Sequence, residues 1–428
     1  METVTLNSKE QQRIMVLNEV ERGSLTGAQA AHLMGVSVRH VRRLLTAFRH
    51  DGVRALAHGN RGRPSPRALS PEVREAVVTL ALGPYDGANH THLTELLAER
   101  DGLHLSRSSV RRILLGEGIR TPRRRRPPRH RRRRERFAQE GMLLQVDGSR
   151  HDWLEGRGPW LTLIGGIDDA TGTVPFACFR EQEDSHGYLR LIEGVIQRKG
   201  VPLAVYSDRH SIFVVSPPRE ATVEEALAGQ APRTQVGRAL DELGISLILA
   251  HSPQAKGRIE RLWGTFQDRL LTELRLADAR TLEDANAALD AFLPRFNTRF
   301  AVPAAESAVA YRPAPAAPQL ADILCFKHQR TVAADNTLRF EGRTLQLLPS
   351  PQRASYARAR VTVHERLEGD IAVSYHGNLV PSRIAEPEPA ALRNKAAERP
   401  GREAAAAASL PAKPAPSHPW RRPFKPPG

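Results

Sequence analysis

The chain has 428 residues, too many for one ordinary domain, and about three domains are expected from length alone. Its 63 Lys and Arg residues against 47 Asp and Glu residues leave a net charge of +16, which favours a polyanionic partner such as nucleic acid. The two cysteines, Cys178 and Cys325, exclude a disulfide framework and a Cys-rich zinc site, and no apolar run approaches the roughly 20 residues that cross a bilayer.

Residues 1–58 predict a helix-turn-helix DNA-binding domain. Three helical patterns follow one another, over 8–23, 28–34 and 37–49, with Ser8, Thr26 and Ser37 as candidate N-terminal caps. Gly35 supplies a tight turn before the third pattern, whose basic side would enter the major groove. A plain helical bundle shares the period, but the turn and the charge favour DNA binding. The expected contacts come from Arg39, His40, Arg42 and Arg43.

A second helix-turn-helix unit, with a winged-helix-like arrangement, is predicted over residues 68–120. Its helical patterns cover 70–82, 90–100 and 106–114. The last pattern has a basic side, and we expect Arg107, Arg111 and Arg112 to contact DNA. Two such units in tandem would read two adjacent segments of one site. The alternative, a single extended helical domain in which only the first unit contacts bases, remains open at this point.

Two segments are predicted to lack a fold of their own. The Arg-rich linker, residues 121–138, includes the run Arg123, Arg124, Arg125 and Arg126. Such a like-charge block repels itself, yet it binds phosphates with strong salt dependence because counterions are released. Residues 386–428 are mostly Ala, Pro, Arg and Lys, so we expect a disordered tail.

Residues 139–305 alternate between strand and helix patterns. The expected strands cover 143–147, 160–167, 174–179, 202–206 and 245–249, and the expected helices cover 185–198, 236–243, 254–274 and 282–296. Three strands, then helix, strand, helix, strand and helix, is the order of the ribonuclease H-like fold. The fold class is therefore multidomain, with all-α units followed by an α/β core.

Three acidic residues stand where a divalent-metal site would need them. Asp147 and Asp208 each end an apolar run of strand length, and Glu260 follows a loop that leads into an amphipathic helix. Two carboxylates at strand ends and one on a helix can meet and hold Mg²⁺ or Mn²⁺, which prefer oxygen ligands. Two such ions, about 4 Å apart, can activate an attacking oxygen and stabilise a leaving oxygen on phosphorus. The pattern predicts cleavage and joining of DNA strands.

Three segments around these acids resemble a known family. They are 144–149 (Leu-Gln-Val-Asp-Gly-Ser), 206–210 (Tyr-Ser-Asp-Arg-His) and 251–261 (His-Ser-Pro-Gln-Ala-Lys-Gly-Arg-Ile-Glu-Arg). The chain resembles the DDE transposases and integrases of the retroviral-integrase superfamily, in particular bacterial insertion-sequence transposases (ISNCY-like). The third segment is the most specific, because Pro-Gln-x-x-Gly-x-x-Glu after a strand is uncommon by chance. The resemblance covers about residues 10–390.

The resemblance implies a function and a set of residue roles. Asp147, Asp208 and Glu260 would be the catalytic triad holding two metal ions, with Lys256 and Arg258 near DNA phosphates. The enzyme would bind terminal inverted repeats, nick the element's end, and then join the new 3′-hydroxyl to target DNA without a nucleotide cofactor. Its partners would be double-stranded DNA and further copies of itself, because two ends must be held together. A bacterial cytoplasmic protein, nucleoid-associated when bound to DNA and without a membrane partner, is expected.

The sequence departs from the retroviral pattern in two places. The gap between Asp208 and Glu260 is longer, and residues 212–235, rich in Pro, Ala and Glu, are expected to form an insert. Helix-turn-helix units replace the retroviral zinc module. Asp168 and Asp169 are the main competing acids, but they precede Ala-Thr-Gly and are expected to be hairpin residues.

Residues 320–385 are predicted to form a small SH3-like β-barrel. Short alternating segments lie at close spacing, separated by turn signals such as Gly342 and Gly369. In the family that the chain resembles, this domain adds contacts to DNA or to protein.

Two other functions compete with an active transposase. One is a catalytically silent DNA-binding regulator that uses the helix-turn-helix units; loss of any one acid of the triad would have favoured it. The other is a nuclease of RNA–DNA hybrids, which tandem helix-turn-helix units disfavour because they read B-form major grooves.

Overall fold

The computed structural model describes residues 5–57, 68–120, 135–215, 232–250, 257–351 and 353–385. The chain divides into two compact units, residues 1–123 and 124–428. Among the helices described, none has the length and apolar character needed to cross a membrane. Three predicted features fall outside the described residues: Arg123–Arg126 with most of the linker, the tail 386–428, and Lys256.

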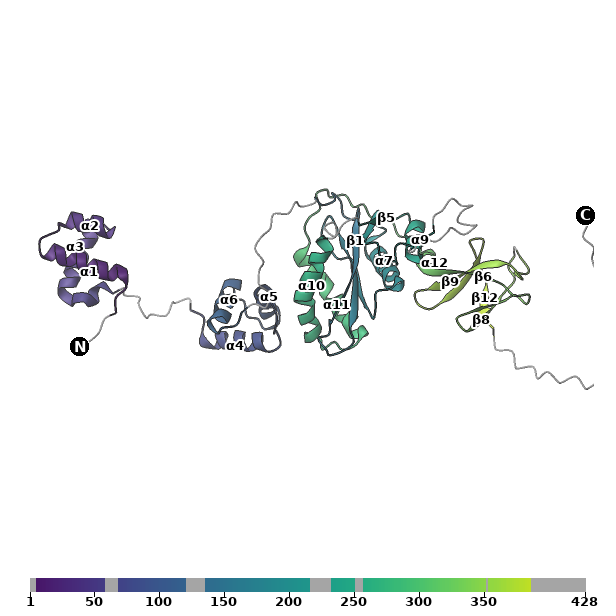
Figure 1. Ribbon diagram of the computed structural model, residues 1–428, viewed down its shortest axis with the longest axis horizontal. Coiled ribbons are helices and arrows are strands. Elements are labelled where there is room, and N and C mark those ends of the chain that lie inside the picture. Colours follow the sequence, from purple (N-terminus) through teal and green to yellow (C-terminus); the bar gives the residue numbers. More distant parts are fainter. Residues whose placement is uncertain are drawn as a thin grey trace, which may run out of the picture. The chain divides into compact units, whose positions relative to one another are not determined.

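The first helical part of the chain contains α1 (Ser8–Glu21), α2 (Gly27–Met34), α3 (Val38–Asp51) and the short 3-10 helix η1 (Gly52–Leu56) (Figure 1). Thr26 and Ser37 cap α2 and α3 as predicted. The prediction of Ser8 as a cap was wrong, because Asn7 caps α1 and exchanges bonds with Glu10 in a capping box. Leu17, Ala30 and Val41 are at the centre of its core.

The second helical part contains α4 (Pro71–Leu82), α5 (His90–Arg100) and α6 (Arg107–Gly116). Ser70, Asn89 and Ser106 cap the three helices, each accepting bonds from backbone N–H groups of the first turn. Both α4 and α5 pack against α6. The three predicted helices are therefore confirmed.

A five-stranded mixed sheet forms the centre of the second unit. Its strands are β1 (Leu144–His151), β2 (Leu161–Asp168), β3 (Phe176–Arg180), β4 (Ala204–Ser207) and β5 (Ser246–Leu249). They lie in the order β3-β2-β1-β4-β5, with β1–β2 and β2–β3 antiparallel and β1–β4 and β4–β5 parallel. The predicted sequence of strands and helices in this α/β core is confirmed.

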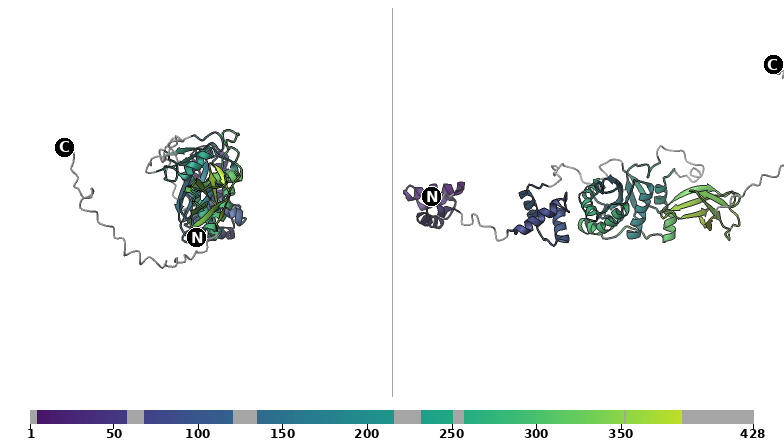
Figure 2. Two further views of the ribbon diagram at one scale, coloured as in Figure 1. Left: turned by 90° about the vertical axis from the view of Figure 1, so that its right-hand side faces the viewer. Right: turned by 90° about the horizontal axis from the view of Figure 1, so that it is seen from below.

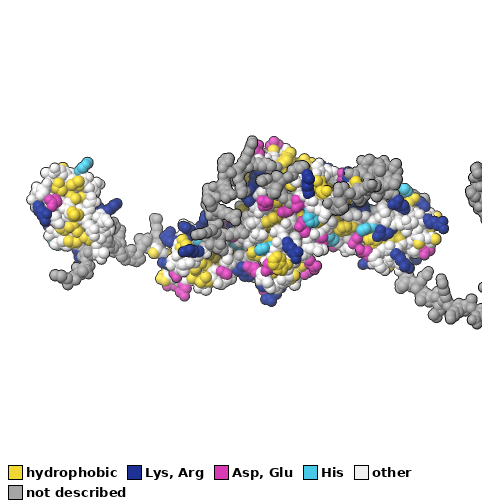
Figure 3. Space-filling view, viewed as in Figure 1, with side chains coloured by type: hydrophobic (Ala, Val, Ile, Leu, Met, Phe, Trp, Pro, Cys, Tyr) yellow, Lys and Arg dark blue, Asp and Glu magenta, His cyan; other side chains and the backbone are white. Residues whose placement is uncertain are grey.

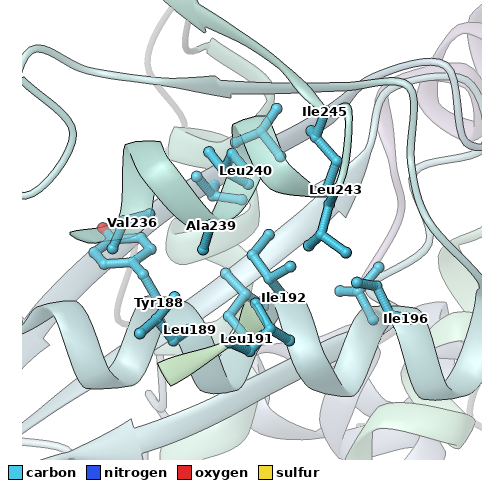
Figure 4. Close-up of a cluster of buried hydrophobic side chains, with 14 of the residues drawn as sticks. Tyr188, Leu189, Leu191, Ile192, Ile196, Val236, Ala239, Leu240, Leu243 and Ile245 are labelled. Atoms are coloured by element: carbon cyan, nitrogen blue, oxygen red, sulfur yellow. The ribbon is translucent and has the colours of Figure 1, made fainter. Parts of the chain in front are cut away.

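Helices cover both faces of this sheet. On one face lie α7 (Ser185–Lys199) and α9 (Gln235–Glu242), and on the other lie α10 (Gly257–Leu276) and α11 (Leu282–Phe300) (Figures 1 and 2). The side chains of α7 and α9 point toward each other in Figure 4, with Ile192 and Leu240 among them. Burial of these apolar groups holds the first face together. A second cluster, centred on Phe266, joins α10 and α11 to the sheet.

Two boundaries of the core carry unexpected contacts. Ile212 and Phe213, at the start of the predicted insert, are buried in the core, while residues 216–231 are outside the described part. At the other boundary, Arg136 and Phe137 belong to the predicted linker. They nevertheless donate hydrogen bonds to the turn after β2.

The C-terminal part is built from two antiparallel sheets around one apolar core. One sheet contains β6 (Cys325–Thr331), β9 (Arg360–Arg366), β10 (Ile371–Tyr375) and β11 (Asn378–Val380). The other contains β7 (Thr337–Phe340), β8 (Arg343–Leu347) and β12 (Ser382–Ile384). A short helix, α12 (Ala317–Ile323), precedes them. Lys327 of β6 forms an ion pair with Glu242, the last residue of the core helix α9. The SH3-like barrel stays a prediction.

Candidate active site

Asp147 and Asp208 lie side by side at one end of the central sheet. The parallel register pairs Leu144 of β1 with Val205 of β4, and the same offset places Asp147 beside Asp208, directly after β4 ends. Laterally paired residues point to the same face of a sheet. Both side chains are half-buried. The prediction that Asp208 directly follows a strand is confirmed, because β4 ends at Ser207. The prediction that Asp147 ends its strand was wrong, because β1 continues to His151, four residues beyond Asp147.

Helix α10 is fastened to this end of the sheet through Trp263. The indole N–H of Trp263 donates to Oδ2 of Asp147 at 3.0 Å. The ring lies over Gly165 of β2, the residue paired with Asp147, and a Cβ on Gly165 would stand only 3.0 Å from the Trp263 ring. A side chain at position 165 would force the Trp263 ring to shift by a few tenths of an ångström, so glycine favours this close approach.

Glu260 occupies the first turn of α10, one turn before Trp263. Its side chain is exposed. Within the described ranges, no group of three His, Cys, Asp or Glu side chains is arranged to hold a metal ion as it stands. The segment before α10, residues 251–256, is not among those described, so the helix is seen from Gly257 onward.

A further carboxylate, Glu183, lies near the same end of the sheet. It accepts a hydrogen bond from the buried hydroxyl of Tyr188 at 2.5 Å. A Cβ on Gly148, the residue after Asp147, would stand 2.7 Å from the carboxyl carbon of Glu183. Burial raises the pKa of Tyr188, and the negative charges of Glu183, Asp147 and Asp208 raise it further. Sequence patterns gave no signal for this neighbour.

Asp168 is a hairpin residue, as predicted. Its carboxylate accepts bonds from the N–H of Gly141 and from the N–H and hydroxyl of Thr171. Burial raises the pKa of Asp168, while these three donors act in the opposite direction. Because these bonds occupy the carboxylate of Asp168, it is not available to bind a metal ion.

Asp169 has a role that its place in the hairpin did not reveal. It is fully buried, and its carboxylate bonds to Gln145 of β1, to the backbone of Phe137 and to the guanidinium of Arg258. Arg258 was predicted to contact phosphates, and that contact stays a prediction. In the structure its side chain is only 13% exposed and is turned inward to Asp169.

The predicted DNA-contacting residues of α3 lie at the surface. Gly35, with φ of 62°, makes the left-handed turn between α2 and α3. Arg39, Arg42 and Arg43 are exposed, and His40 is half-buried with Nδ1 3.0 Å from Arg43 Nη2. Lys and Arg side chains are visible at the surface of both helical parts in Figure 3. This arrangement suits a recognition helix, although the base contacts themselves stay predictions.

On α6, Arg107, Arg111 and Arg112 are all exposed. His90 of α5 is buried, and burial lowers its pKa, with the positive charges of Arg111 and Arg107 lowering it further. Positive charge is therefore concentrated on this side of the second helical part, as phosphate binding requires.

Comparison with known proteins identifies the family. A transposase of insertion sequence IS1202 from Streptococcus pneumoniae is 30% identical over 402 residues, covering 85% of this chain and 83% of that protein. A protein of Sinorhizobium fredii described as a transposase, y4bF, is 37% identical over 385 residues, covering 90% of this chain and 82% of that protein. The chain belongs to the insertion-sequence transposases. Its function is DNA transposition, and the transposase is accordingly a polynucleotidyl transferase.

Two further comparisons concern parts of the transposase. The family described as winged helix-turn-helix matches residues 13–75, which begin in α1 and end in α4, and this supports DNA binding. The match runs across the boundary predicted between the two helical units.

Among solved structures, the human T-lymphotropic virus 2 integrase catalytic core with magnesium covers 36% of this chain and 86% of its own, at 17% identity and a TM-score of 0.26. A simian T-cell lymphotropic virus intasome covers 72% and 98%, at 15% identity and a TM-score of 0.30. TM-scores this low do not establish a shared fold, so the family assignment depends on the sequence relatives.

Proposed function

We propose that the transposase is a DDE enzyme in which Asp147, Asp208 and Glu260 form the catalytic triad. The observation that carries this is the alignment of Asp147 with Asp208 on one face of adjacent parallel strands, with α10 fastened to Asp147 by Trp263. Its reaction is cleavage at the terminal inverted repeats of an insertion sequence, followed by transfer of the cut strand to target DNA.

The residues present suit Mg²⁺ or Mn²⁺ because all three donors are carboxylates, the ligands that hard divalent cations prefer. Two ions held there would activate the attacking oxygen and stabilise the leaving oxygen on phosphorus. Asp147 and Asp208 supply the fixed part of the site. Glu260, exposed at the start of α10, would complete it when its side chain turns toward the sheet.

The protein's own groups contribute orientation and charge. The Trp263 N–H fixes one oxygen of Asp147, which leaves the carboxylate in a defined rotamer. The negative charges of Glu183, Asp147 and Asp208 all act on Tyr188, so this part of the sheet would attract divalent cations and admit phosphate only together with them. A dedicated metal pair therefore fits the electrostatics.

The basic helical parts would hold the DNA ends. Arg39, Arg42 and Arg43 on α3 are exposed for the major groove of a terminal repeat, and α6 presents a second basic surface. The C-terminal sheets, in our proposal an SH3-like barrel, would add contacts to DNA or to another copy. We propose a homo-oligomer on DNA, because joining requires two ends in one complex.

The test compares wild type with Asp208→Asn on a duplex that carries the end of the element. The matched control is Glu283→Gln, which changes an exposed acid in the first turn of α11. Wild type and the control should cut and transfer strands with Mg²⁺ or Mn²⁺, and Asp208→Asn should bind the duplex without cutting it. Cleavage by Asp208→Asn at the wild-type rate would remove Asp208 from the triad. Binding without cleavage by all three proteins would indicate the regulator instead.

A further inference from the structure

The buried carboxylate of Asp169 joins three separate segments of the core. Its Oδ1 accepts a bond from Gln145 Nε2 at 2.7 Å and pairs with Arg258, and its Oδ2 accepts the N–H of Phe137 at 2.9 Å. Asp169 itself has no exposed surface. The backbone carbonyl of Asp169 also accepts a bond from Arg136. Strand β1, the segment before it, and helix α10 are thus connected through one side chain.

Two of these connections reach the proposed active site directly. Gln145 is two residues before Asp147 on β1, so the two side chains share one face of the sheet. Arg258 is two residues before Glu260, in the first turn of α10. Through its bond to Gln145, Asp169 is connected to the strand that carries Asp147, and through Arg258 it is connected to the turn that carries Glu260.

We propose that Asp169 and Arg258 are positioning residues for strand cleavage: their ion pair fixes the first turn of α10, and with it Glu260, against the strand that carries Asp147. The inference depends on the triad proposed above. In this proposal Arg258 pairs with a buried carboxylate inside the protein. The sequence had suggested a phosphate contact instead, because Arg258 is positively charged and lies close to Glu260 in the chain.

The physical reason lies in how α10 is held. Farther along the helix, Trp263 and Phe266 are buried in the apolar cluster, which fixes the axis of α10 over the sheet. Ile259, in the first turn, is already buried in the same cluster, whereas its neighbour Glu260 is exposed, at a helix end where turns fray unless side chains hold them. An arginine that pairs with a buried carboxylate supplies a directional bond at that point. Groups that orient metal ligands in this way typically affect metal affinity or activity by about 10–100-fold when removed.

The same helix offers a matched control. In its last turn, Arg275 makes a two-point ion pair with Glu155, with N–O distances of 2.8 and 2.9 Å. This pair is more exposed, at 27% and 35%, than the pair of Arg258 and Asp169, at 13% and 0%. Arg275→Gln therefore removes an Arg–carboxylate pair from α10 without touching its first turn.

The experiment uses the full-length protein with Asp169→Asn, Arg258→Gln and Arg275→Gln. Arg258→Gln keeps the bonds of Asp169 to Gln145 and Phe137 but leaves a buried carboxylate without its arginine. Asp169→Asn removes that buried charge, so the two variants disturb the fold in different ways and serve as checks on each other. Two quantities are measured: binding of Mn²⁺ alone to the protein, by the electron paramagnetic resonance signal of free Mn²⁺, and the Mg²⁺ concentration for half-maximal cleavage of an end duplex. Thermal melting and duplex binding are followed in parallel.

We expect Asp169→Asn and Arg258→Gln to weaken Mn²⁺ binding and raise the Mg²⁺ requirement by about 10–100-fold, with duplex binding unchanged. Arg275→Gln should behave as wild type. Combining Arg258→Gln with Glu260→Gln should be no worse than Glu260→Gln alone, because one acts through the other.

Wild-type metal dependence in both Asp169→Asn and Arg258→Gln would overturn the inference, as would an equal change in Arg275→Gln. Faster cleavage by either variant would also overturn it, because the pair would then restrain Glu260 from acting. Failure of the underlying triad gives a different result: Glu260→Gln would then cleave as wild type does, whatever the two positioning variants show.

Discussion

The two faces of the central sheet are built from different chemistry. On the face covered by α7 and α9, the contacts are mostly apolar, with the hydrogen bond from Tyr188 to Glu183 as a polar exception, and a Cβ on Gly194 of α7 would stand 2.4 Å from the Phe176 ring. On the face covered by α10, the apolar packing around Phe266 extends to Ile259 in the first turn, and it is joined there by bonds from Trp263 to Asp147 and from Arg258 to Asp169. One face gives stability through burial, and the other adds a polar site at its end.

This difference predicts that substitutions will separate into two classes. Substitutions on the α7 face should lower the free energy of unfolding. They should not change the metal concentration that the folded enzyme needs for cleavage. Changes at the polar end of the α10 face should alter chemistry more than stability. Each prediction below tests one side of that division.

The largest effect is expected for Asp147→Asn. The amide keeps an oxygen that can accept the Trp263 N–H, so the packing of α10 is retained while the ligand charge is lost. Loss of several kcal/mol of metal-assisted transition-state stabilisation corresponds to about 10³-fold or more in rate. Single-turnover cleavage measures the rate, and thermal melting checks the fold. If the variant had a much lower melting temperature but the wild-type cleavage rate, Asp147 would have a structural role and not a catalytic one.

On the opposite face, Ile192→Ala should act on stability. Ile192 is 2% exposed and faces the side chains of α9 (Figure 4). Removing such a buried side chain typically costs about 2–5 kcal/mol through lost burial and the cavity left behind. Denaturant unfolding measures this loss. The Mg²⁺ concentration for half-maximal cleavage, measured below the melting temperature, should stay at the wild-type value; a shift would mean that the two faces are coupled.

Much of the α7 face was predictable from the sequence because it depends on repeating patterns. The apolar period of 185–198 and the strand runs around it predicted both the elements and their order. A strand end also predicted the position of Asp208, and the parallel register of β1 and β4 brings Asp147 beside it, although Asp147 lies within its strand and not at the end. Local chemistry also predicted the turn at Asp168, which the Thr171 bonds confirm.

The polar end of the α10 face was not predictable in the same way. The pairing of Asp169 with Arg258 joins residues far apart in sequence, and each had a local explanation, one as a turn residue and the other as a DNA contact. Trp263 had the apolar spacing of a core residue, and nothing in a helical period shows that its N–H reaches Asp147. Such bonds depend on how elements pack, which local patterns do not encode.

A smaller effect is expected for Trp263→Phe. Phenylalanine keeps an aromatic ring at position 263 but removes the N–H that orients Asp147, together with the outer edge of the indole that lies over Gly165. A hydrogen bond to a charged group contributes about 1.5–3 kcal/mol, so the cleavage rate should fall roughly 10–100-fold. The ratio of rates with Mn²⁺ and Mg²⁺ distinguishes orientation from packing. Leu262→Val, in the same buried layer of α10, is the control and should lower stability without changing that ratio.

The smallest effect is expected for the pH dependence of stability in the C-terminal sheets. It tests whether stability and catalysis are also separate in that region, outside the α/β core. His364 of β9 is buried and lies 2.8 Å from the Ser374 hydroxyl, near Asp322, Lys327 and Arg238. Burial lowers its pKa below the ordinary value of 6.5, Lys327 and Arg238 act in the same direction, and Asp322 opposes them.

The unfolded chain therefore binds a proton at His364 before the folded chain does, and the free energy of unfolding should fall as the pH drops through 6.5. His364→Gln removes this titration, so the difference in melting temperature between pH 7.5 and pH 5.5 should be smaller in the variant than in wild type. The cleavage rate per folded molecule should have the same pH profile in both proteins. An equal pH dependence of melting in the two would show that the proton is taken up elsewhere, and a changed cleavage profile would connect the C-terminal sheets to the chemistry. The division between a stabilising region and a reacting one would then hold only within the α/β core.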